Sequence, residues 1–244
     1  MTKRLLSLAG LIAMALVMAV ATSAQAIWLD AGASKTWQKK YTVGIDAQYR
    51  TSNKLESTER WGIGANFGWK PVKWLKVGAD YSFIYSHRPE RTTKKGNLVE
   101  DYWQPRHRVG VSLTGSLKFN RWELSLRERW QYTRNQGVNA LKFGPDGLDK
   151  GYEYIPVRNR HVLRTRLKLE WGIKKKCPFT PYVSAEMYNS LNKAFQVTKV
   201  RYTAGCDYKI DRHNSVGLFY RFVDSYDNDE TNLNVIGLEY AFKL

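Results

Sequence analysis

The sequence predicts an all-β fold, a transmembrane, antiparallel, up-and-down β-barrel of about ten strands, with twelve strands as the alternative. Three observations predict it: apolar and polar residues alternate with period two, short connections alternate with long ones, and the last strand runs to the chain end. After the N-terminal segment, no stretch approaches the roughly 18 consecutive apolar residues of a membrane helix. The mean hydropathy of −0.50 does not test this fold, because it averages the two faces of each strand.

The first 26 residues have the organisation of a secretory signal peptide. Lys3 and Arg4 precede a largely apolar stretch, and Ala24 and Ala26 form the small-x-small pattern that a signal peptidase accepts. Cleavage would leave 218 residues with 37 basic and 22 acidic side chains, a net charge of +15. An exported chain does not meet chromosomal DNA, so we expect no nucleic-acid partner. Export together with the barrel pattern predicts a location in the outer membrane of a Gram-negative cell.

Ten segments of the mature chain have the period-two pattern and a length near the 9 to 11 residues that span a membrane. The first places Tyr41, Val43, Ile45, Ala47 and Tyr49 on one face and polar residues between them. The ten segments are 41–50, 60–70, 75–85, 107–119, 122–132, 160–173, 179–188, 198–208, 215–222 and 233–244. Residues 27–39 form a weaker pattern, either an N-terminal segment or an extra strand, and the barrel proper is expected over 40–244.

The connections alternate in length, as in outer-membrane barrels with periplasmic turns and longer external loops. The short ones are 71–73, 120–121, 174–178 and 209–214; the long ones are 51–58, 86–106, 133–159, 189–197 and 223–232. With ten strands, both ends of the barrel lie on the periplasmic side. A twelve-strand barrel would need a further strand inside 133–159.

The apolar face is predicted to point outward to lipid. Trp61 and Trp69 lie at the two ends of one strand, about 26 Å apart, as expected of the aromatic girdles that border an apolar band. The alternative is a soluble, lipocalin-like barrel, which would place Trp61 and Phe67 in its core. The final strand, with Phe242 and Leu244, is similar to the assembly signal of outer-membrane barrels. The expected partners are therefore outer-membrane lipid, lipopolysaccharide and the barrel-assembly machinery.

With the apolar face outward, the opposite face carries an excess of basic residues into the lumen. Sixteen are basic and seven acidic, which accounts for +9 of the net +15. The candidate basic ladder, a possible anion contact, comprises Arg60, Arg108, Arg127, Arg129, Arg164, Arg166, Lys168, Arg201 and Arg221; the remaining bases are Lys40, Arg50, Lys70, Lys76, Lys118, Arg160 and Lys199. The candidate acidic partners are Asp80, Glu123, Glu170, Glu186 and Asp207, with Asp46 and Glu239 on the same face.

Three functions fit this lumen. The favoured hypothesis is a closed, structural barrel filled by an arginine–carboxylate lattice. The second is a narrow, porin-like, anion-selective conduit in which guanidinium groups bind small acidic solutes. The third is a hydrolase at the outer rim, for which Asp101 with His107, or Asp149 with His161, would have to meet through folding. No Gly-x-Ser-x-Gly, HExxH or Cys/His cluster is present, so no catalytic residue, metal or cofactor is predicted.

Cys177 and Cys206 flank one predicted hairpin at its periplasmic end and share the outward face. Opposed residues of an antiparallel pair can lie about 4.5 Å apart, a span that a disulfide can bridge. The oxidising compartment favours a bond between them, and two thiols a register step apart are the alternative.

Several motifs resemble a family of outer-membrane barrels known as domain of unknown function 2490. They are Arg106-His107-Arg108-Val109, Leu126-Arg127-Glu128-Arg129-Trp130, Arg164-Thr165-Arg166-Leu167, Thr180-Pro181-Tyr182 with Glu186, Arg201-Tyr202-Thr203-Ala204-Gly205 and Tyr220-Arg221. The resemblance covers nearly the whole mature chain. It implies a small outer-membrane β-barrel from a Bacteroidota-like bacterium and brings no activity and no functional residues.

Overall fold

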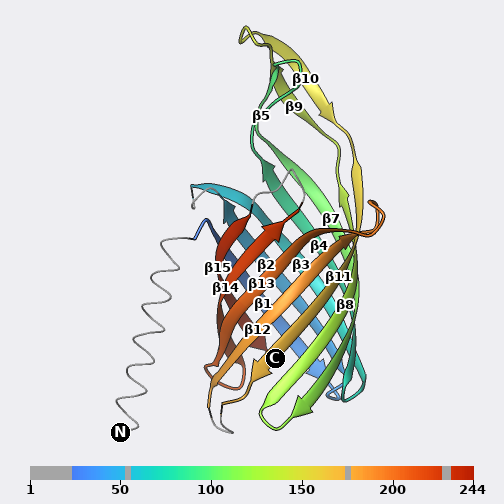
Figure 1. The fold of residues 1–244 in the computed structure, drawn as a ribbon, viewed down its shortest axis with the longest axis vertical. Coiled ribbons are helices and arrows are strands. Elements are labelled where there is room, and N and C mark those ends of the chain that lie inside the picture. Colours follow the sequence, from blue (N-terminus) through green and yellow to red (C-terminus); the bar gives the residue numbers. More distant parts are fainter. Residues whose placement is uncertain (1–23, 53–55, 174–176, 227–231) are drawn as a thin grey trace, which may run out of the picture.

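A closed β-barrel forms the body of the protein (Figure 1). The computed structural model describes residues 24–52, 56–173, 177–226 and 232–244. Within them, eleven strands follow one another around the wall in the order β1-β15-β14-β13-β12-β11-β8-β7-β4-β3-β2. Their bounds are β1 Ala26–Trp37, β2 Tyr41–Ser52, β3 Ser57–Val72, β4 Leu75–Arg88, β7 Tyr102–Phe119, β8 Trp122–Asn135, β11 Arg158–Trp171, β12 Phe179–Ser190, β13 Gln196–Lys209, β14 Asn214–Ser225 and β15 Leu233–Lys243.

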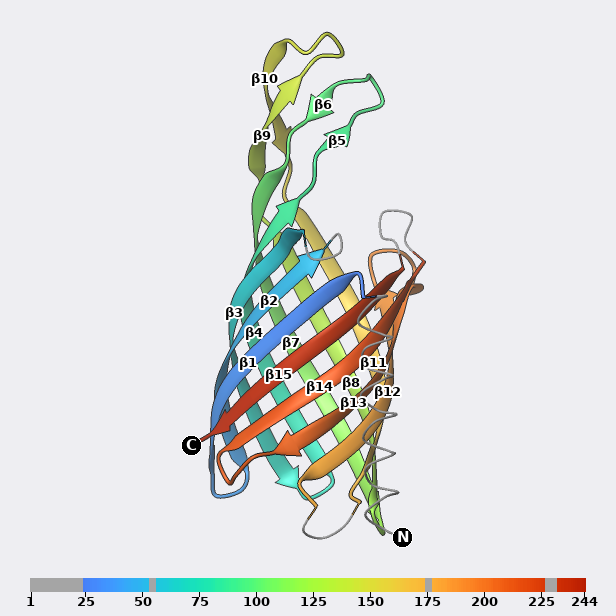
Figure 2. The same cartoon turned by 90° about the vertical axis from the view of Figure 1, so that its left-hand side faces the viewer.

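A second, four-stranded sheet stands above one end of the barrel (Figure 2). It contains β5 Arg91–Thr92, β6 Leu98–Val99, β9 Val138–Phe143 and β10 Asp149–Ile155, in the order β10-β9-β6-β5. The sequence predicted loops here. The residues form strands because Val99, Ala140 and Ile155 bury their side chains against one another. We call this end of the barrel the sheet end and the opposite end, with its short connections, the turn end.

The all-β barrel is confirmed, but ten strands was the wrong count among the described residues, and so was the alternative of twelve. The weak pattern over 27–39 belongs to β1, which pairs antiparallel with β2 and parallel with β15. The parallel pair closes the barrel. An odd number of strands also separates the ends: β1 begins at the sheet end, whereas β15 finishes at the turn end (Figure 2). Of the predicted signal peptide, residues 1–23 lie outside the described part.

Tight turns join the strands at the turn end. Gln38 and Lys39 both have positive φ angles, 50° and 58°, and the Lys40 amide donates to the Trp37 carbonyl, which closes a tight turn within the three-residue connection between β1 and β2. At the turn between β13 and β14, Asp211 accepts hydrogen bonds from the Asn214 side chain and from the backbone amides of residues 213 and 214. These hydrogen bonds lower the pKa of the exposed Asp211 carboxyl, and the bond from the Asn214 side chain has the largest effect.

The strands present apolar side chains outward and polar side chains inward. Trp61 and Phe67, which a soluble barrel would bury, are 41% and 46% exposed on the outer wall. Other large apolar side chains of the same outer surface are Ile45, Ile63, Val111, Leu113, Leu117, Leu126, Leu167, Val183, Leu218 and Leu238. No helix in the described ranges is long and apolar enough to cross a membrane.

One apolar cluster lies inside the barrel, at the seam where β1 meets β15. Trp28 and Phe219 are each 2% exposed and pack with Ala26, Val223 and Val235. The Phe219 ring lies directly over Gly237 of β15, a position where any Cβ atom would overlap the ring. The seam is thus held by side-chain packing as well as by the β1–β15 ladder.

The predicted disulfide is absent, and both cysteines are free thiols. The register explains this result, because Cys206 lies opposite Pro181 and Phe179 lies opposite Tyr208. Cys177 precedes the first residue of β12 and therefore has no register position opposite Cys206. A disulfide needs Cα atoms within about 7 Å, so the spacing favours the alternative of two unpaired thiols.

We expect Gly237→Val to destabilise the folded barrel by about 1–3 kcal/mol, because the added side chain must displace the buried Phe219 ring. Urea unfolding in detergent, followed by tryptophan fluorescence, measures the change. Gly115→Val is the control, since a Cβ at Gly115 meets nothing within 4 Å. Equal midpoints for the two variants would contradict the packing described at the seam.

Candidate functional site

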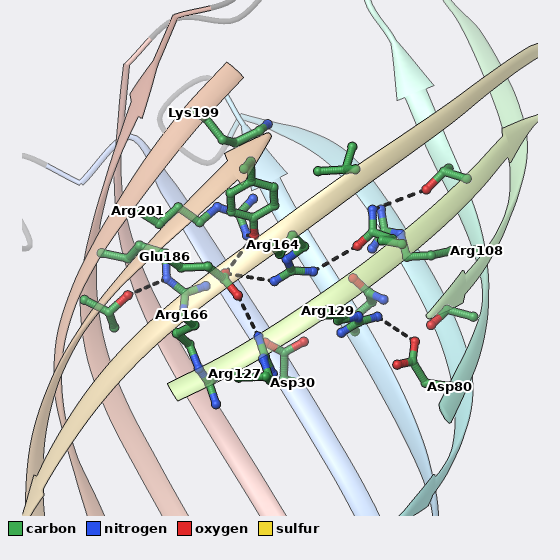
Figure 3. A pocket seen from close by; sticks show the side chains of 18 of the residues that line it. Asp30, Asp80, Arg108, Arg127, Arg129, Arg164, Arg166, Glu186, Lys199 and Arg201 are labelled. Atoms are coloured by element: carbon green, nitrogen blue, oxygen red, sulfur yellow. Dashed lines mark hydrogen bonds and ion pairs between the residues drawn. The ribbon is translucent and has the colours of Figure 1, made fainter. Parts of the chain in front are cut away.

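A cavity of about 470 Å³ lies inside the barrel (Figure 3). Thirteen of its lining residues are basic and five are acidic. The basic residues are Arg50, Arg60, Arg106, Arg108, Arg127, Arg129, Arg160, Arg164, Arg166, Lys168, Lys199, Arg201 and Arg221; the acidic ones are Asp30, Asp46, Asp80, Glu186 and Glu239. The cavity wall therefore carries a formal surplus of eight positive charges.

The strand register places arginines directly opposite one another on this inner face. Arg164 pairs with Arg129 and Arg166 with Arg127 across the β8–β11 ladder, and Arg50 pairs with Arg60 across β2 and β3. Like charges directly opposed on one face of a sheet destabilise it. The fold keeps these pairs, so negative charge must compensate for them.

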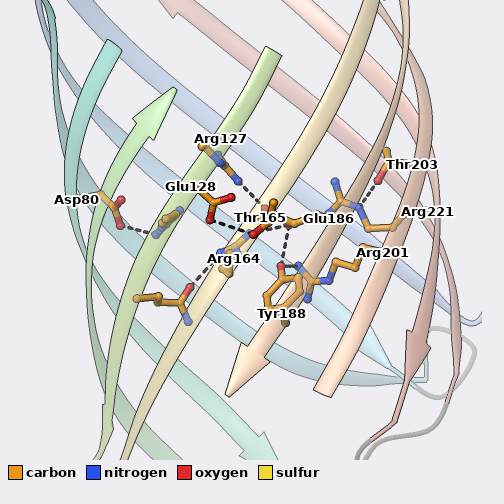
Figure 4. Close-up of polar contacts among 12 residues, drawn as sticks. Asp80, Arg127, Glu128, Arg164, Thr165, Glu186, Tyr188, Arg201, Thr203 and Arg221 are labelled. Carbon is orange, nitrogen blue, oxygen red and sulfur yellow. Dashed lines mark hydrogen bonds and ion pairs between the residues drawn. The ribbon is translucent and has the colours of Figure 1, made fainter. Parts of the chain in front are cut away.

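Glu186 supplies part of that compensation (Figure 4). Its two carboxylate oxygens accept hydrogen bonds from Arg127, at 2.6 Å, and from Arg164, at 2.8 Å. The Tyr188 hydroxyl also donates to it, at 2.9 Å, and in turn accepts a bond from Arg201. Glu186 is 7% exposed, and one buried carboxylate thereby links arginines from three strands, β8, β11 and β13.

Asp80 compensates for the charge of Arg129, another arginine of the β8–β11 ladder. Its carboxylate forms an ion pair with Arg129 at 2.5 Å, across the intervening strand β7. The pair lies over Gly110, where a Cβ would come within 2.7 Å of the Arg129 side chain and 2.8 Å of Asp80. The missing side chain at Gly110 is therefore what gives the ion pair its space.

Even the paired arginines have N–H groups without a hydrogen-bond acceptor in the described part of the chain. Arg60 forms an ion pair with Glu59 at 3.8 Å, which is beyond hydrogen-bond distance. The Nε atoms of nine arginines are buried and find no hydrogen-bond acceptor among the residues that the structure describes: Arg50, Arg60, Arg106, Arg108, Arg127, Arg129, Arg164, Arg166 and Arg201. Trp28 partly substitutes for an acceptor. The Arg50 guanidinium lies 3.8 Å from its ring centroid, and those of Arg201 and Arg221 lie 5.0 Å away.

The nine residues of the candidate basic ladder all line this cavity. Of the candidate acidic partners, Asp80 and Glu186 line it, whereas Glu123 pairs with Lys118, Glu170 pairs with Lys168, and Asp207 is not part of the lining. Lys40, Lys70, Lys76 and Lys118 also lie outside the lining.

Sequence reasoning missed two of the charged lining residues, Asp30 and Arg106. Asp30 was missed because residues 27–39 were not counted as a strand, and Arg106 because it was placed in a loop. Arg106 shares its parity with Arg108, which was the available signal.

The histidine pairs considered for a rim hydrolase do not form. Nδ1 of His107 instead shares a 2.7 Å hydrogen bond with the Tyr81 hydroxyl. His161 packs against Tyr132, with their ring centroids 4.9 Å apart. Asp101 pairs with His87 at 2.6 Å beside the Trp103 ring. A histidine–carboxylate pair alone supplies no nucleophile. Within the described ranges, no three His, Cys, Asp or Glu residues gather as a metal site would require.

Glu186→Gln should destabilise the barrel by about 3 kcal/mol or more, because it leaves two buried arginines without their carboxylate. Glu123→Gln is the matched control. Its partner Lys118 is largely exposed, and a pair of that kind contributes at most about 1 kcal/mol. Urea midpoints measured by tryptophan fluorescence separate the two variants. A loss no larger for Glu186→Gln than for the control would contradict the role assigned to Glu186.

No curated protein matches this chain. A family model described as "Protein of unknown function (DUF2490)" matches residues 25–234, from the start of β1 into β15. The match takes in ten of the eleven barrel strands completely and the first two residues of β15, so it excludes Glu239 of the cavity lining. The chain therefore belongs to the DUF2490 family of proteins of unknown function.

Proposed function

We propose that the protein is an outer-membrane β-barrel that forms a narrow, anion-selective conduit. The outer wall supports the membrane part of this proposal. Its exposed apolar band includes Ile45, Ile63, Leu117 and Val183, all more than half exposed, which in water would be an unusually large apolar surface. In a bilayer, the same band contacts lipid.

Aromatic side chains border the band at both ends of the barrel, as in the girdles of membrane barrels. At the turn end, Trp122 stacks on Trp171 and Phe179 packs on Tyr208. Towards the sheet end, Tyr85 contacts Trp61 and stacks on Trp103. Lipid and lipopolysaccharide are then the partners of the outer wall, and the barrel-assembly machinery is the partner of the folding chain.

The observation that carries the conduit is the charge of the cavity lining. Thirteen bases and five acids surround a cavity of about 470 Å³, and the buried Nε atoms of nine arginines have no acceptor in the described part of the chain. A closed structural lattice needs carboxylates in similar number to its arginines, because an uncompensated buried charge costs several kcal/mol. Mobile anions and water provide the compensation that the lining does not, which favours a conduit over the closed structural barrel.

The entrance to this conduit is proposed to lie at the sheet end. Five arginines line the cavity near the sheet ends of their strands, and we call them the arginine ring: Arg50, Arg60, Arg106, Arg108 and Arg160. They come from four strands, β2, β3, β7 and β11. Planar guanidinium groups bind carboxylate and phosphate through paired hydrogen bonds, and their summed field raises the local concentration of anions.

The test is the current through single barrels in a planar bilayer under a KCl gradient. We expect a reversal potential with the sign of chloride permeation. Arg60→Gln with Arg108→Gln should lower the chloride-to-potassium permeability ratio several-fold, because two charges of the ring are lost.

Lys94→Gln with Lys95→Gln is the matched control, with the same change of charge on exposed residues beyond the barrel. It should leave the permeability ratio nearly unchanged. Heat-modifiable mobility on a gel establishes that each variant is folded. The absence of any current, or a potassium-selective current, would contradict the proposal.

A further inference from the structure

Three of the five acidic residues of the cavity lie on adjacent strands at one side of the barrel. Asp30 of β1 lies beside Glu239 of β15 in the register, and Asp46 lies on the neighbouring strand β2. We call these three residues the acidic wall. Asp46 interacts electrostatically with Asp30, and so does Glu239, so the three carboxylates form one negative region.

Glycine gives this wall its shape. Asp46 lies opposite Gly64 of β3, where a Cβ would come within 2.7 Å of the Asp46 carboxylate. The carboxylate therefore extends across the neighbouring strand, where a larger residue would block it. Asn66 steadies it by donating a 3.3 Å hydrogen bond.

Arg50 of β2 and Arg221 of β14 lie beside the acidic wall, whereas four arginines occupy the opposite side. In the closed barrel, four strands separate β1 from β11 in one direction, and four separate it from β8 in the other. The strands β8 and β11 are thus diametrically opposite β1, and they carry Arg127, Arg129, Arg164 and Arg166, which we call the basic wall. In Figure 3, Asp30 lies behind Arg127, on the far side of the barrel.

The two walls face each other across the same cavity. All seven residues line it. Asp46 interacts electrostatically with Arg129 of the basic wall, and Glu239 interacts with Lys168 of β11. The walls are therefore at a common level between the two ends of the barrel.

The opposed charges are not cancelled by contact. In the part of the chain that the structure describes, Asp30, Asp46 and Glu239 form no ion pair. Gln48, opposite Asp30, has a buried side-chain oxygen without a hydrogen-bond donor. On the basic wall, the buried Nε atom of Arg166 has no hydrogen-bond acceptor in the described part of the chain. A cationic group at the acidic wall and an anionic group at the basic wall would satisfy both sides.

We propose that this level of the lumen selects dipolar solutes, small molecules such as α-amino acids that carry a carboxylate and an ammonium group together. The inference rests on the proposed conduit and names its substrate class. A field directed across the path orients a dipole, with the carboxylate towards the guanidinium groups and the ammonium towards the carboxylates. Both groups then exchange their water for charge-assisted hydrogen bonds, which an uncharged molecule of equal size cannot form.

The experiment measures osmotic swelling of proteoliposomes that contain the full barrel. L-Alanine and lactamide are isomers of similar size, one dipolar and one uncharged. We expect alanine to enter at least about threefold faster than lactamide. Asp30→Asn, Asp46→Asn and Glu239→Gln, combined in one variant, should bring the ratio close to one while chloride selectivity is retained or increased.

The matched control, Glu90→Gln with Asp146→Asn and Asp149→Asn, makes the same change of charge on exposed residues beyond the barrel and should keep the wild-type ratio. Asp46→Asn alone should lower the ratio partly, and it serves if the triple variant does not fold. Suppose that chloride still passes but the wild-type barrel admits alanine and lactamide equally fast, or that the acidic-wall variants leave the ratio of their entry rates unchanged. Either result overturns the inference of dipolar selectivity and leaves the proposed conduit standing. Permeation of neither solutes nor ions overturns the proposed conduit and this inference with it.

Discussion

The surplus of positive charge enclosed by the barrel is the constraint on which the other features of the interior depend. Arginines directly opposed across the β8–β11 ladder repel one another, and the register fixes their backbone positions side by side. Glu186 and Asp80 neutralise part of it through short, buried contacts. Gly110 and Gly64 are the corresponding adjustments of the wall, because each leaves space for a carboxylate that would otherwise be displaced. In the proposed conduit, mobile anions balance the remaining charge.

The way in which the barrel closes determines where the charges face one another. The parallel β1–β15 pair brings Asp30 beside Glu239 and places both opposite the arginines of β8 and β11. The same closure buries Trp28 against Phe219. The indole ring of Trp28 there forms cation–π contacts with three guanidinium groups. Without β1, the lumen would lose Asp30 from its acidic wall and the indole that contacts arginines from three strands.

The sequence was sufficient for the strands whose alternation is strong and for the faces of those strands, because side-chain parity is a local property. Trp61 and Phe67 point outward as the aromatic pattern predicts, and Arg127, Arg129, Arg164 and Arg166 point inward. The strand count was not accessible in the same way. The inward positions of β1 include Gly32 and Ser34, which weaken its pattern, and its parallel pairing with β15 joins segments more than 200 residues apart.

Register was the second property that the sequence did not determine. Cys177 and Cys206 have suitable parity for a disulfide, but Cys206 lies opposite Pro181, and Cys177 precedes the first residue of β12. The same limitation applies to the ion pairs. Glu186 was a candidate partner on parity alone, while its choice of Arg127 and Arg164 follows from the β8–β11–β12 ladders. The connection 86–106 had no strand pattern, because β5 and β6 contain two residues each.

Anomalous diffraction from crystals grown in bromide tests most directly whether the surplus charge is balanced by small anions. The account predicts bromide sites within the cavity, beside arginines whose Nε atoms have no acceptor in the described chain, such as Arg108 and Arg166. It also predicts that none lies against Asp30, Asp46 or Glu239. Bromide on the outer surface but none inside the barrel would contradict the central claim, because the lining would then hold its charge without mobile anions.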